Sequence, residues 1–404
     1  MYIKRHIEAV VTDLLKEYPC ILISGPRQVG KSTLIQNLKE EKPREYISLD
    51  DIALRTAAKS DPKTFLQDHK PPICIDEIQY APELFPYIKM IIDKHHRAGD
   101  FILTGSQIYR LMRNVRESLA GRIAILNMQG FSLSEITGLP NLQFIPDREA
   151  YIARNQKEPL DSPAVFNRIY RGGMPEIVSG VRSDPSRFYS SYIATYLIRD
   201  IRDIAQVDEP KFFKFLTAAA ARTAQILNVA ELARDAEISV PTANAWLNIL
   251  ETLGIIYYLH PYSNNLLKRT IKKPKLYFYD TGLVCHLARW TSSEALANGA
   301  QAGAMFETFA ISEIMKSCFN AGCEPYLYYY RDVDMREIDL LIEQNQMLYP
   351  VEIKKTAAVD SRIAGTFKLI EKSGLKQGMG AVICMNDRLS SISENTLTIP
   401  ITSI

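Results

Sequence analysis

The chain has 404 residues, with 48 Lys and Arg against 46 Asp and Glu, and a formal net charge of +2. Its content of 47% hydrophobic and 23% charged residues is typical of a globular protein and excludes a largely disordered chain. The near-zero net charge also excludes a uniformly basic nucleic-acid coat, although it allows a local basic patch. At about 100–200 residues per domain, we expect two to four domains.

The six cysteines are scattered, form no C-x-x-C pair and mostly lie in apolar runs. We therefore expect buried free thiols in a reducing cytoplasm rather than disulfides or a zinc site. The start of the chain, MYIKRHIEAVVTDLLKEYP, is charged throughout, so it predicts an amphipathic helix and no signal peptide. No uncharged apolar stretch approaches the ~20 residues that a membrane span needs, so we predict a cytoplasmic protein without a membrane partner.

The first part of the chain alternates short apolar runs with helical stretches. A helix is predicted over residues 31–40, and five strands are predicted within residues 20–24, 46–50, 71–79, 101–106 and 122–128. Such alternation is typical of a parallel sheet that is covered by helices on both faces. The predicted fold class is therefore α/β.

The remaining elements follow a different order. A stretch rich in Pro, Asn and charge over residues 139–163 predicts a boundary or lid connection, and a long helical tract follows over 186–205. Residues 211–260 read as helix, short turn, helix and strand, which is the pattern of a winged helix-turn-helix. The last hundred or so residues predict a helix, three strands, a helix and a strand, at 303–317, 326–330, 337–343, 347–353, 360–373 and 380–385.

An unbroken G-x-x-x-x-G-K-[ST] motif follows the first predicted strand and opens a helix. Its glycines let backbone N–H groups converge on phosphate oxygens, and the helix N-terminus adds further donors. We expect Lys31 to reach the β/γ-phosphates of ATP and the Ser32 hydroxyl to bind Mg²⁺. The predicted nucleotide contacts are Gly25, Pro26, Arg27, Gln28, Val29, Gly30, Lys31, Ser32 and Thr33.

Two acids end the third predicted strand, in the sequence ICIDE. An ATPase needs a carboxylate at the end of a neighbouring strand to hold magnesium, and we assign that role to Asp76. Glu77 is then placed to polarise the attacking water. The pair of acids favours hydrolysis over a simple nucleotide-binding switch.

The fourth predicted strand ends in TGS, so Ser106, or alternatively Thr104, is placed to hydrogen-bond the γ-phosphate or the attacking water. Phosphoryl transfer often sets an arginine against the transition-state charge, sometimes from a neighbouring subunit. Among the arginines after TGS we select Arg122, and its action in trans would require a homo-oligomer. Asp50 and Asp51 end the second strand, where they either line the nucleotide crevice or cap the next helix.

The motifs GPRQVGKST, ICIDEIQ, LTGSQ and SLAGR, in this order, resemble those of a large prokaryotic family of AAA-type P-loop ATPases. Members of that family carry a C-terminal domain of unknown function. GGMPE (172–176), YLIRDI (196–201), KLYFYDTGL (275–283) and FETFAISEI (306–314) are similar to further landmarks of the family, so the resemblance covers essentially the whole chain. It implies ATP binding and hydrolysis. One departure is Gln107, where LTGSS is commoner, and Arg171 and Arg199 are the candidates for a lid arginine.

A second set of charged residues lies near the C-terminus. Asp339 falls in one predicted strand, and Glu352 and Lys354, two residues apart, share one face of the next. With Glu307 on the preceding helix, they fit a PD-(D/E)xK nuclease, in which the acids bind Mg²⁺ and the lysine orients water. A solvated strand face, or a nuclease fold retained only for binding, fits the same residues.

The second helix of the winged-helix pattern contains no Lys or Arg. Base contacts would rest on Thr242, Asn244 and Asn248, whereas Leu247, Leu250 and Leu253 are expected in the core. Basic residues after it are placed for phosphate contacts, namely Lys268, Arg269, Lys272, Lys273 and Lys275. A module that only packs between domains is the alternative.

The sequence thus predicts an AAA-type ATPase core (1–138), a helical lid (139–207), a winged-helix module (208–275) and an α/β restriction-endonuclease-like domain (276–404). One hypothesis is an ATPase whose nucleotide cycle gates a C-terminal region directed at DNA, with nuclease activity left open. The other is an ATP-dependent regulatory switch with a catalytically silent C-terminal fold. The cofactors are ATP and Mg²⁺ in both.

Overall fold

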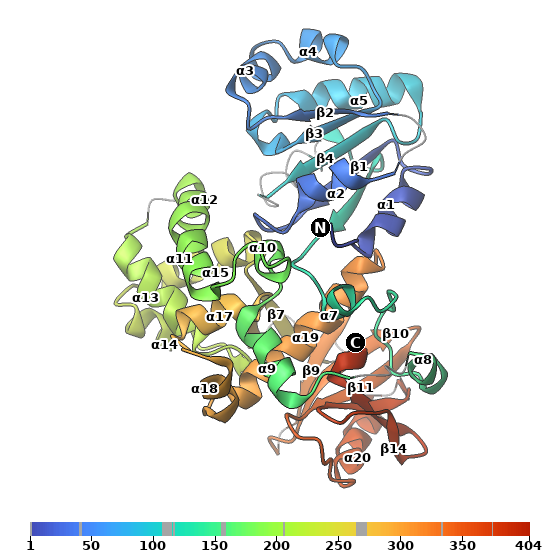
Figure 1. Ribbon diagram of the computed structural model, residues 1–404, viewed down its shortest axis with the longest axis vertical. Helices are drawn as coiled ribbons and strands as arrows, with labels where there is room; N and C mark the ends of the chain where they lie inside the picture. The colour runs from blue at the N-terminus through green and yellow to red at the C-terminus, as the bar shows by residue number, and fades with distance from the viewer. Residues whose placement is uncertain are drawn as a thin grey trace. The chain divides into compact units, whose positions relative to one another are not determined.

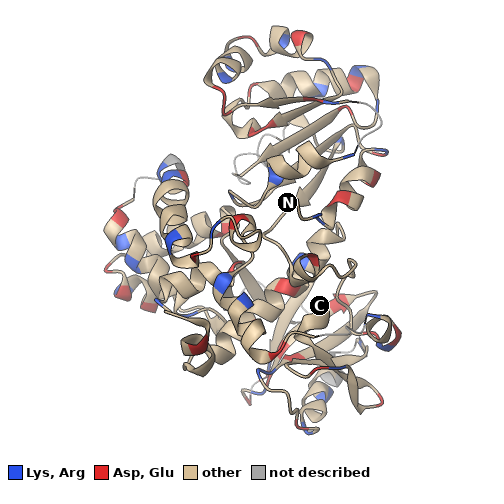
Figure 2. Cartoon of the chain, viewed as in Figure 1, with Lys and Arg blue, Asp and Glu red and all other residues tan. Residues whose placement is uncertain are grey.

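The structure is a computed structural model. It describes residues 2–39, 43–106, 115, 118–154, 159–204, 207–263, 273–332, 334–373 and 375–404. These residues divide into two compact units. The first unit covers 1–130 with 252–254 and 319–322, and the second covers 131–251, 255–318 and 323–404. Figure 2 shows basic and acidic residues interspersed along the ribbon of each unit, in keeping with the small net charge.

The first unit is built on a five-stranded sheet in the order β2-β3-β4-β1-β5 (Figure 1). All four strand pairs are parallel. The strands are β1 (Cys20–Ser24), β2 (Glu45–Ser48), β3 (Ile73–Asp76), β4 (Phe101–Gly105) and β5 (Ile123–Asn127). Because the strands are parallel, the loops after β1, β3 and β4 all leave from one edge of the sheet. The predicted α/β class with a parallel sheet is confirmed.

Helices cover this sheet, and their apolar residues explain why its central strands are buried along their whole length. The helices are α1 (Ile7–Leu14), α2 (Lys31–Asn37), α3 (Ile52–Ser60), α4 (Pro62–Asp68), η1 (Ile78–Tyr80) and α5 (Leu84–His95). Leu22, Ile75 and Leu103 form one core with α3, α4 and α5. Ile21 and Ile23, on the opposite face of β1, are equally buried, as expected of a strand covered on both faces.

The second unit starts with helices. The tract predicted over 186–205 is a continuous run of α11 (Pro185–Tyr192), a π-helical turn (Ile193–Leu197) and α12 (Ile198–Ile204). The helical elements are α7 (Leu133–Thr137), α8 (Arg148–Ala153), α9 (Ser162–Arg171), α10 (Pro175–Val178), α11 (Pro185–Tyr192), η2 (Ile193–Leu197), α12 (Ile198–Ile204), α13 (Glu209–Ala220), α14 (Val229–Asp235), α15 (Val240–Thr252), α17 (Thr281–Leu287), α18 (Ser293–Asn298), α19 (Ala302–Asn320), α20 (Ile363–Thr366), η3 (Phe367–Ser373) and η4 (Ile401–Ser403).

A mixed sheet of ten strands runs through the second unit in the order β14-β15-β13-β11-β10-β9-β7-β8-β6, with β12 beside β11. The strands are β6 (Gln225–Ile226), β7 (Ile256–Pro261), β8 (Lys275–Phe278), β9 (Leu327–Arg331), β10 (Glu337–Gln344), β11 (Met347–Ile353), β12 (Lys376–Gln377), β13 (Gly380–Cys384), β14 (Ser390–Ser393) and β15 (Thr396–Pro400). Because β7 pairs with both β8 and β9, the sheet is continuous across the boundary that we predicted at 275/276.

The long helix α19 is buried around nearly its whole circumference, and its few charged residues have partners. Lys316 and Glu313, one turn apart, form an ion pair with an Nζ–Oε1 distance of 2.8 Å. Glu313 also accepts from the Leu133 N–H at 2.6 Å, and the Lys316 ammonium donates to the Phe131 carbonyl at 3.2 Å. The pair thus fixes the start of the second unit to α19 by satisfying both buried charges.

Several smaller predictions have an outcome. All six cysteines lie within the described residues and none is in a disulfide; five are buried and Cys323 is exposed. Residues 7–14 form the expected amphipathic helix, with Ile7 and Val11 buried. Within the described ranges, no helix has the length and apolar content to cross a membrane. The strands β14 and β15 were not predicted.

Candidate functional site

The loop between β1 and α2 depends on its two glycines. Gly25 has φ +155°, and a Cβ there would lie 2.0 Å from the carbonyl oxygen of Met128. Gly30 caps α2 with φ +95°, in the left-handed region that L side chains rarely adopt. Any side chain at Gly25 would therefore push the loop off β5, and one at Gly30 would strain the start of α2.

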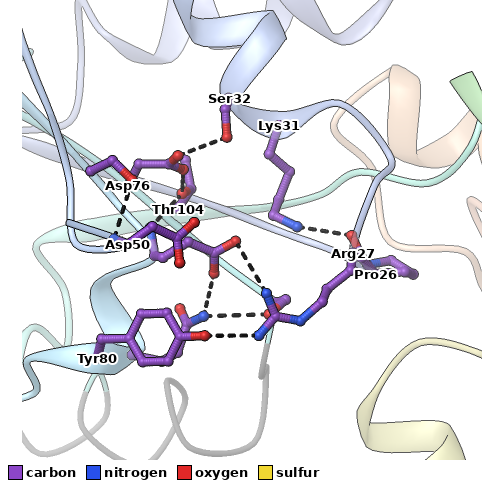
Figure 3. Close-up of polar contacts among 12 residues, drawn as sticks. Pro26, Arg27, Lys31, Ser32, Asp50, Asp76, Tyr80 and Thr104 are labelled. Atoms are coloured by element: carbon purple, nitrogen blue, oxygen red, sulfur yellow. Dashed lines mark hydrogen bonds and ion pairs between the residues drawn. The ribbon is translucent and has the colours of Figure 1, made fainter. Parts of the chain in front are cut away.

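Two buried cations hold this loop. The guanidinium of Arg5 donates to the Val29 carbonyl at 3.0 Å and to the Gln129 carbonyl at 2.7 Å. The Lys31 ammonium donates to the carbonyls of Gly25 and Pro26 at 2.9 and 2.8 Å. The positive charge of Lys31 therefore lies inside the curve of the loop (Figure 3). Sequence reasoning missed Arg5, because a basic residue near the N-terminus carries no signal of burial.

Asp76 ends β3 and accepts hydrogen bonds from three hydroxyl groups, and Figure 3 labels two of the donors, Ser32 and Thr104. Ser32 Oγ lies 2.7 Å and Tyr46 Oη 2.6 Å from its Oδ2 atom, and Thr104 Oγ1 contacts its Oδ1 atom. Burial, and then the bond to Asp76, raises the pKa of Tyr46 above its usual range. The predicted magnesium pair, Ser32 and Asp76, is thus in direct contact, and Tyr46 joins it unforeseen.

Glu77 follows Asp76 in the left-handed region, with φ +56°. A non-glycine residue there is strained and needs support from its surroundings. Its backbone N–H donates to Thr104 Oγ1 at 3.1 Å. Thr104, the alternative to Ser106 in our prediction, thus bonds to both acids and sets the turn that directs their side chains apart.

The carboxylate of Glu77 is nearly buried beside the end of β4. Gln79 Nε2 donates to one of its oxygens and also to Ser106 Oγ, which is 3.3 Å away. Among the described residues, Gln79 Oε1 is buried without a hydrogen-bond donor, so an acceptor remains there for a water or substrate group. Lys31, Ser32, Asp76, Glu77 and Ser106 lie at or after the ends of the parallel strands β1, β3 and β4, and therefore at one edge of the sheet.

Arg122 lies at the other edge. It directly precedes β5, whose first residue is paired with Cys20 at the start of β1, whereas the loop leaves the end of β1. The strand length of five residues separates the two edges by ~16 Å. Arg122 NH2 lies 3.2 Å from Asp93 Oδ2 on α5. The geometry excludes contact with a nucleotide bound in the loop of the same chain, so only the trans prediction remains.

The other candidates near this edge have structural partners. Asp51 caps α3 by accepting from the N–H groups of Ala53 and Leu54 at 2.8 and 3.1 Å, which settles the alternative that we left open for it. Asp50 lies 3.9 Å from Arg55. Gln107 lies outside the described residues, as do Arg110, Arg113 and Arg116.

The predicted C-terminal set also converges. The register of β10 and β11 pairs Leu340 with Val351, so the next pair along is Asp339 and Glu352. Lys354 Nζ lies 2.7 Å from Glu352 Oε2 and 3.4 Å from Asp339 Oδ2. Burial, and then the charge of Asp339, raises the pKa of Glu352 to about 8. For Lys354, burial lowers the pKa, but the charges of Asp339 and Glu352 outweigh it and raise the pKa.

Glu307 is held by groups that we did not foresee. Tyr277 Oη donates to it at 2.5 Å, and Lys275 Nζ lies 3.2 Å from the same oxygen and 2.5 Å from Glu337. Burial, and then Asp339, raises the pKa of Glu307. Within the part of the chain that the structure describes, no three His, Cys, Asp or Glu side chains are grouped to hold a metal ion.

Lys275 corrects one prediction for the winged-helix region. Its side chain is only 5% exposed and forms ion pairs with Glu307 and Glu337. It therefore cannot contact a phosphate backbone. Asn244 and Asn248 are exposed on α15, whereas Leu247, Leu250 and Leu253 are buried as expected. Lys268, Arg269 and Lys272 fall outside the described residues.

Two of the sequence motifs, GGMPE and KLYFYDTGL, meet in one cluster of hydrogen bonds around Asp280. The Asp280 carboxylate accepts from the Gly173 N–H at 2.8 Å, from Tyr189 Oη at 2.6 Å and from the Leu283 N–H at 2.9 Å. A Cβ at Gly172 would lie 2.2 Å from the Tyr189 hydroxyl. GGMPE and YDTG are thus explained by packing. Arg171 donates to the carbonyls of Ser183 and Ile177 at 3.2 and 3.3 Å, within this same unit.

Three family models match the chain. Residues 17–137 match an AAA domain, residues 163–294 a domain of unknown function (DUF8612), and residues 302–404 a second domain of unknown function (DUF4143). The uncharacterized proteins Rv2008c of Mycobacterium tuberculosis and Mb2031c of Mycobacterium bovis are each 28% identical over 357 residues, which is 88% of this chain and 74% of theirs.

Solved structures with some similarity include the Walker-type ATPase PABY2304 of Pyrococcus abyssi, at 17% identity and a TM-score of 0.45 over 71% of this chain and 96% of that chain. The RuvB Holliday junction branch migration motor of Thermotoga maritima has 17% identity and a TM-score of 0.32 over 62% and 88%. TM-scores this low carry no conclusion about this chain. The AAA match over 17–137, on a parallel sheet with a P-loop, supports an AAA-type ATPase that binds ATP.

Proposed function

We propose that the protein is a Mg²⁺-dependent ATPase whose catalytic residues lie in the first unit. The contact between Ser32 and Asp76, with Glu77 fixed on the next residue, is the observation that carries the proposal. Lys31 binds the β/γ-phosphates, and Glu77 polarises the attacking water beside Ser106. Apart from Pro26, which has no N–H group, the residues of 25–33 supply the backbone donors for the phosphates.

The residues at this edge fit a magnesium ion, because a carboxylate and a hydroxyl oxygen are the hard donors that it prefers. Asp76 and Ser32 would hold it. When bound, Mg²⁺ neutralises the charge on the phosphate oxygens. Because Asp76 is almost fully buried and its partners are hydroxyl groups, the carboxylate is already oriented before a metal arrives.

A titration of the purified chain with a fluorescent ATP analogue, with and without Mg²⁺, tests this proposal. We expect saturable binding that is tighter with Mg²⁺, and phosphate release that requires it. Correctly folded protein that shows no saturable binding would refute the proposal.

A second candidate function concerns the C-terminal cluster. The position of Asp339 opposite Glu352, with Lys354 bonded to both, favours a nuclease-like site directed at DNA and gated by the nucleotide cycle. The order α13, β6, α14, α15, β7, β8, with β8 paired to both β6 and β7, is compatible with a winged helix. Glu307 is bound by Lys275, so a metal here would rest on Asp339 and Glu352. The alternative is a regulatory switch with a silent nuclease-like fold.

Incubation with linear, circular and single-stranded DNA, in Mg²⁺ or EDTA and with or without ATP, separates these two functions. A nuclease is expected to lose cleavage in Asp339→Asn and Lys354→Ala but keep it in Asp387→Asn, an exposed control. Cleavage that Lys31→Ala alters only through its ATP response would support gating. Absence of any Mg²⁺-dependent cleavage would favour the switch. A homo-oligomer and a cytoplasmic location stay predictions.

A further inference from the structure

The two oxygens of the Glu77 carboxylate have different partners. Gln79 Nε2 donates to Oε2, and Arg27 NH1 lies 4.0 Å from Oε1. Gln79 follows two residues later in the same turn, but Arg27 belongs to the loop after β1. The orientation of Glu77 is therefore set jointly by its own turn and by the loop that we assign to the phosphates.

Arg27 is itself fixed. Its NH2 group donates to Tyr80 Oη at 3.1 Å, and the guanidinium of Arg55 lies over the Tyr80 ring, 4.1 Å from its centroid. The side chains of Arg27 and Glu77 are only 7% and 11% exposed, so solvent screens their attraction less than it screens a surface pair. A buried, doubly held guanidinium cannot turn toward a phosphate without leaving Glu77 or Tyr80.

We propose that Arg27 is a positioning residue for Glu77 rather than a ligand of the phosphates. It connects the conformation of the P-loop to the orientation of the carboxylate that polarises water. This inference rests on the proposed ATPase function. It also replaces the direct nucleotide contact that the motif alone predicted for Arg27.

The test measures single-turnover hydrolysis and ATP affinity for the wild type, Arg27→Gln, Glu77→Gln and the double variant. We expect Arg27→Gln to lower the hydrolysis rate by up to about 100-fold, the size of effect that a misplaced catalytic group has, with ATP affinity within about threefold. In the Glu77→Gln background, Arg27→Gln should cause no further loss, because its effect passes through Glu77.

Two further variants sharpen the result. Arg27→Lys keeps the positive charge but loses the fork that reaches Tyr80, so we expect partial recovery of the rate. Arg97→Gln removes an exposed arginine of the same unit and should leave the rate unchanged. If Arg27→Gln instead weakens ATP binding in proportion to its loss of activity, or if the two losses add in the double variant, Arg27 is a phosphate ligand and the inference fails.

The inference can also fail separately from the ATPase proposal. Thermal unfolding of the same four proteins needs no ATP, and a coupling between the two substitutions is expected there. Independent, additive effects on the unfolding midpoint would overturn the contact itself. A wild type that binds no ATP would instead reject the proposed function and leave that coupling to be judged on its own measurement.

Discussion

The P-loop edge and the C-terminal cluster both combine carboxylates with lysines, but they distribute the charge differently. At the P-loop edge, Asp76 is bonded by hydroxyl groups, and Glu77 is turned away from it toward Gln79 and Arg27. In the C-terminal cluster, Asp339 and Glu352 face each other across two strands, and the pKa of Glu352 is raised. A single turn can thus direct the carboxylates of adjacent acids apart, whereas carboxylates on paired strands stay close enough for the charge of one to raise the pKa of the other.

The difference predicts different chemistry. A site whose carboxylates have separate donors is prepared for a metal and a polyphosphate that bring their own charges. Where carboxylates are crowded together, neighbouring groups of the protein offset their negative charge. Here Lys275 and Lys354 form ion pairs with the carboxylates, and the pKa of Glu307 is raised. Breaking each site separately therefore tests whether both are functional or only the first.

The largest effect is expected from Glu77→Gln. General-base assistance contributes about 10²–10⁴-fold to a rate, so hydrolysis should fall within that range while ATP binding persists. Phosphate release and ATP affinity, measured on the same sample, check this. Glu83→Gln, at an exposed position nearby, is the control. Hydrolysis at the wild-type rate in Glu77→Gln would remove Glu77 from the reaction.

Lys31→Ala should act mainly on binding. A hydrogen bond to a charged group is worth about 1.5–3 kcal/mol, so ATP affinity should fall by roughly 10-fold to 150-fold. Isothermal titration with ATP and Mg²⁺ measures it, and Lys94→Ala, an exposed lysine on α5, should bind normally. An unchanged affinity would show that the ammonium of Lys31 serves only to hold the loop carbonyls.

At the C-terminal cluster, the prediction concerns how the stability of the folded chain changes with pH. The folded-state pKa of Glu352 is raised above its ordinary value to about 8, so the folded chain retains a proton that the unfolded chain loses at lower pH. Its contribution to stability is therefore present in acid and is lost as the pH rises toward 8. Glu352→Gln should flatten this loss between pH 5 and pH 8 in urea unfolding, whereas Glu394→Gln, at an exposed position, should not. Equal slopes in all three proteins would contradict the crowded cluster.

The smallest effect is expected from Arg122→Ala. Its pair with Asp93 is more than one-third exposed, so solvent screens it and its loss should change stability little, and the residue lies at the far edge of the sheet. ATP affinity should match that of Asp93→Ala, which removes the same pair. If specific activity rises with protein concentration in the wild type but not in Arg122→Ala, the arginine acts in trans. A concentration-independent rate in both proteins would end that role.

The sequence alone determined the local features of this protein. Short apolar runs located all five strands of the first sheet, and β1, β3 and β4 are the clearest of them because both of their faces are buried. The P-loop motif and the acids after β3 are local patterns that specify their own turn, so residues such as Lys31 and Asp76 were identified without a structure. The opposition of Asp339 and Glu352 followed from strand alternation in the same way.

Only the tertiary structure decided which residues meet across the chain. Tyr46, Arg5 and Lys275 have no sequence signal of their role, because each acquires it from a partner far away in the chain. Arg122 shows the converse: the sequence selects it as the catalytic arginine, but strand direction places it at the edge opposite the P-loop. Local propensity fixes the elements, whereas register, strand direction and the pairing of buried charges depend on how distant segments pack together.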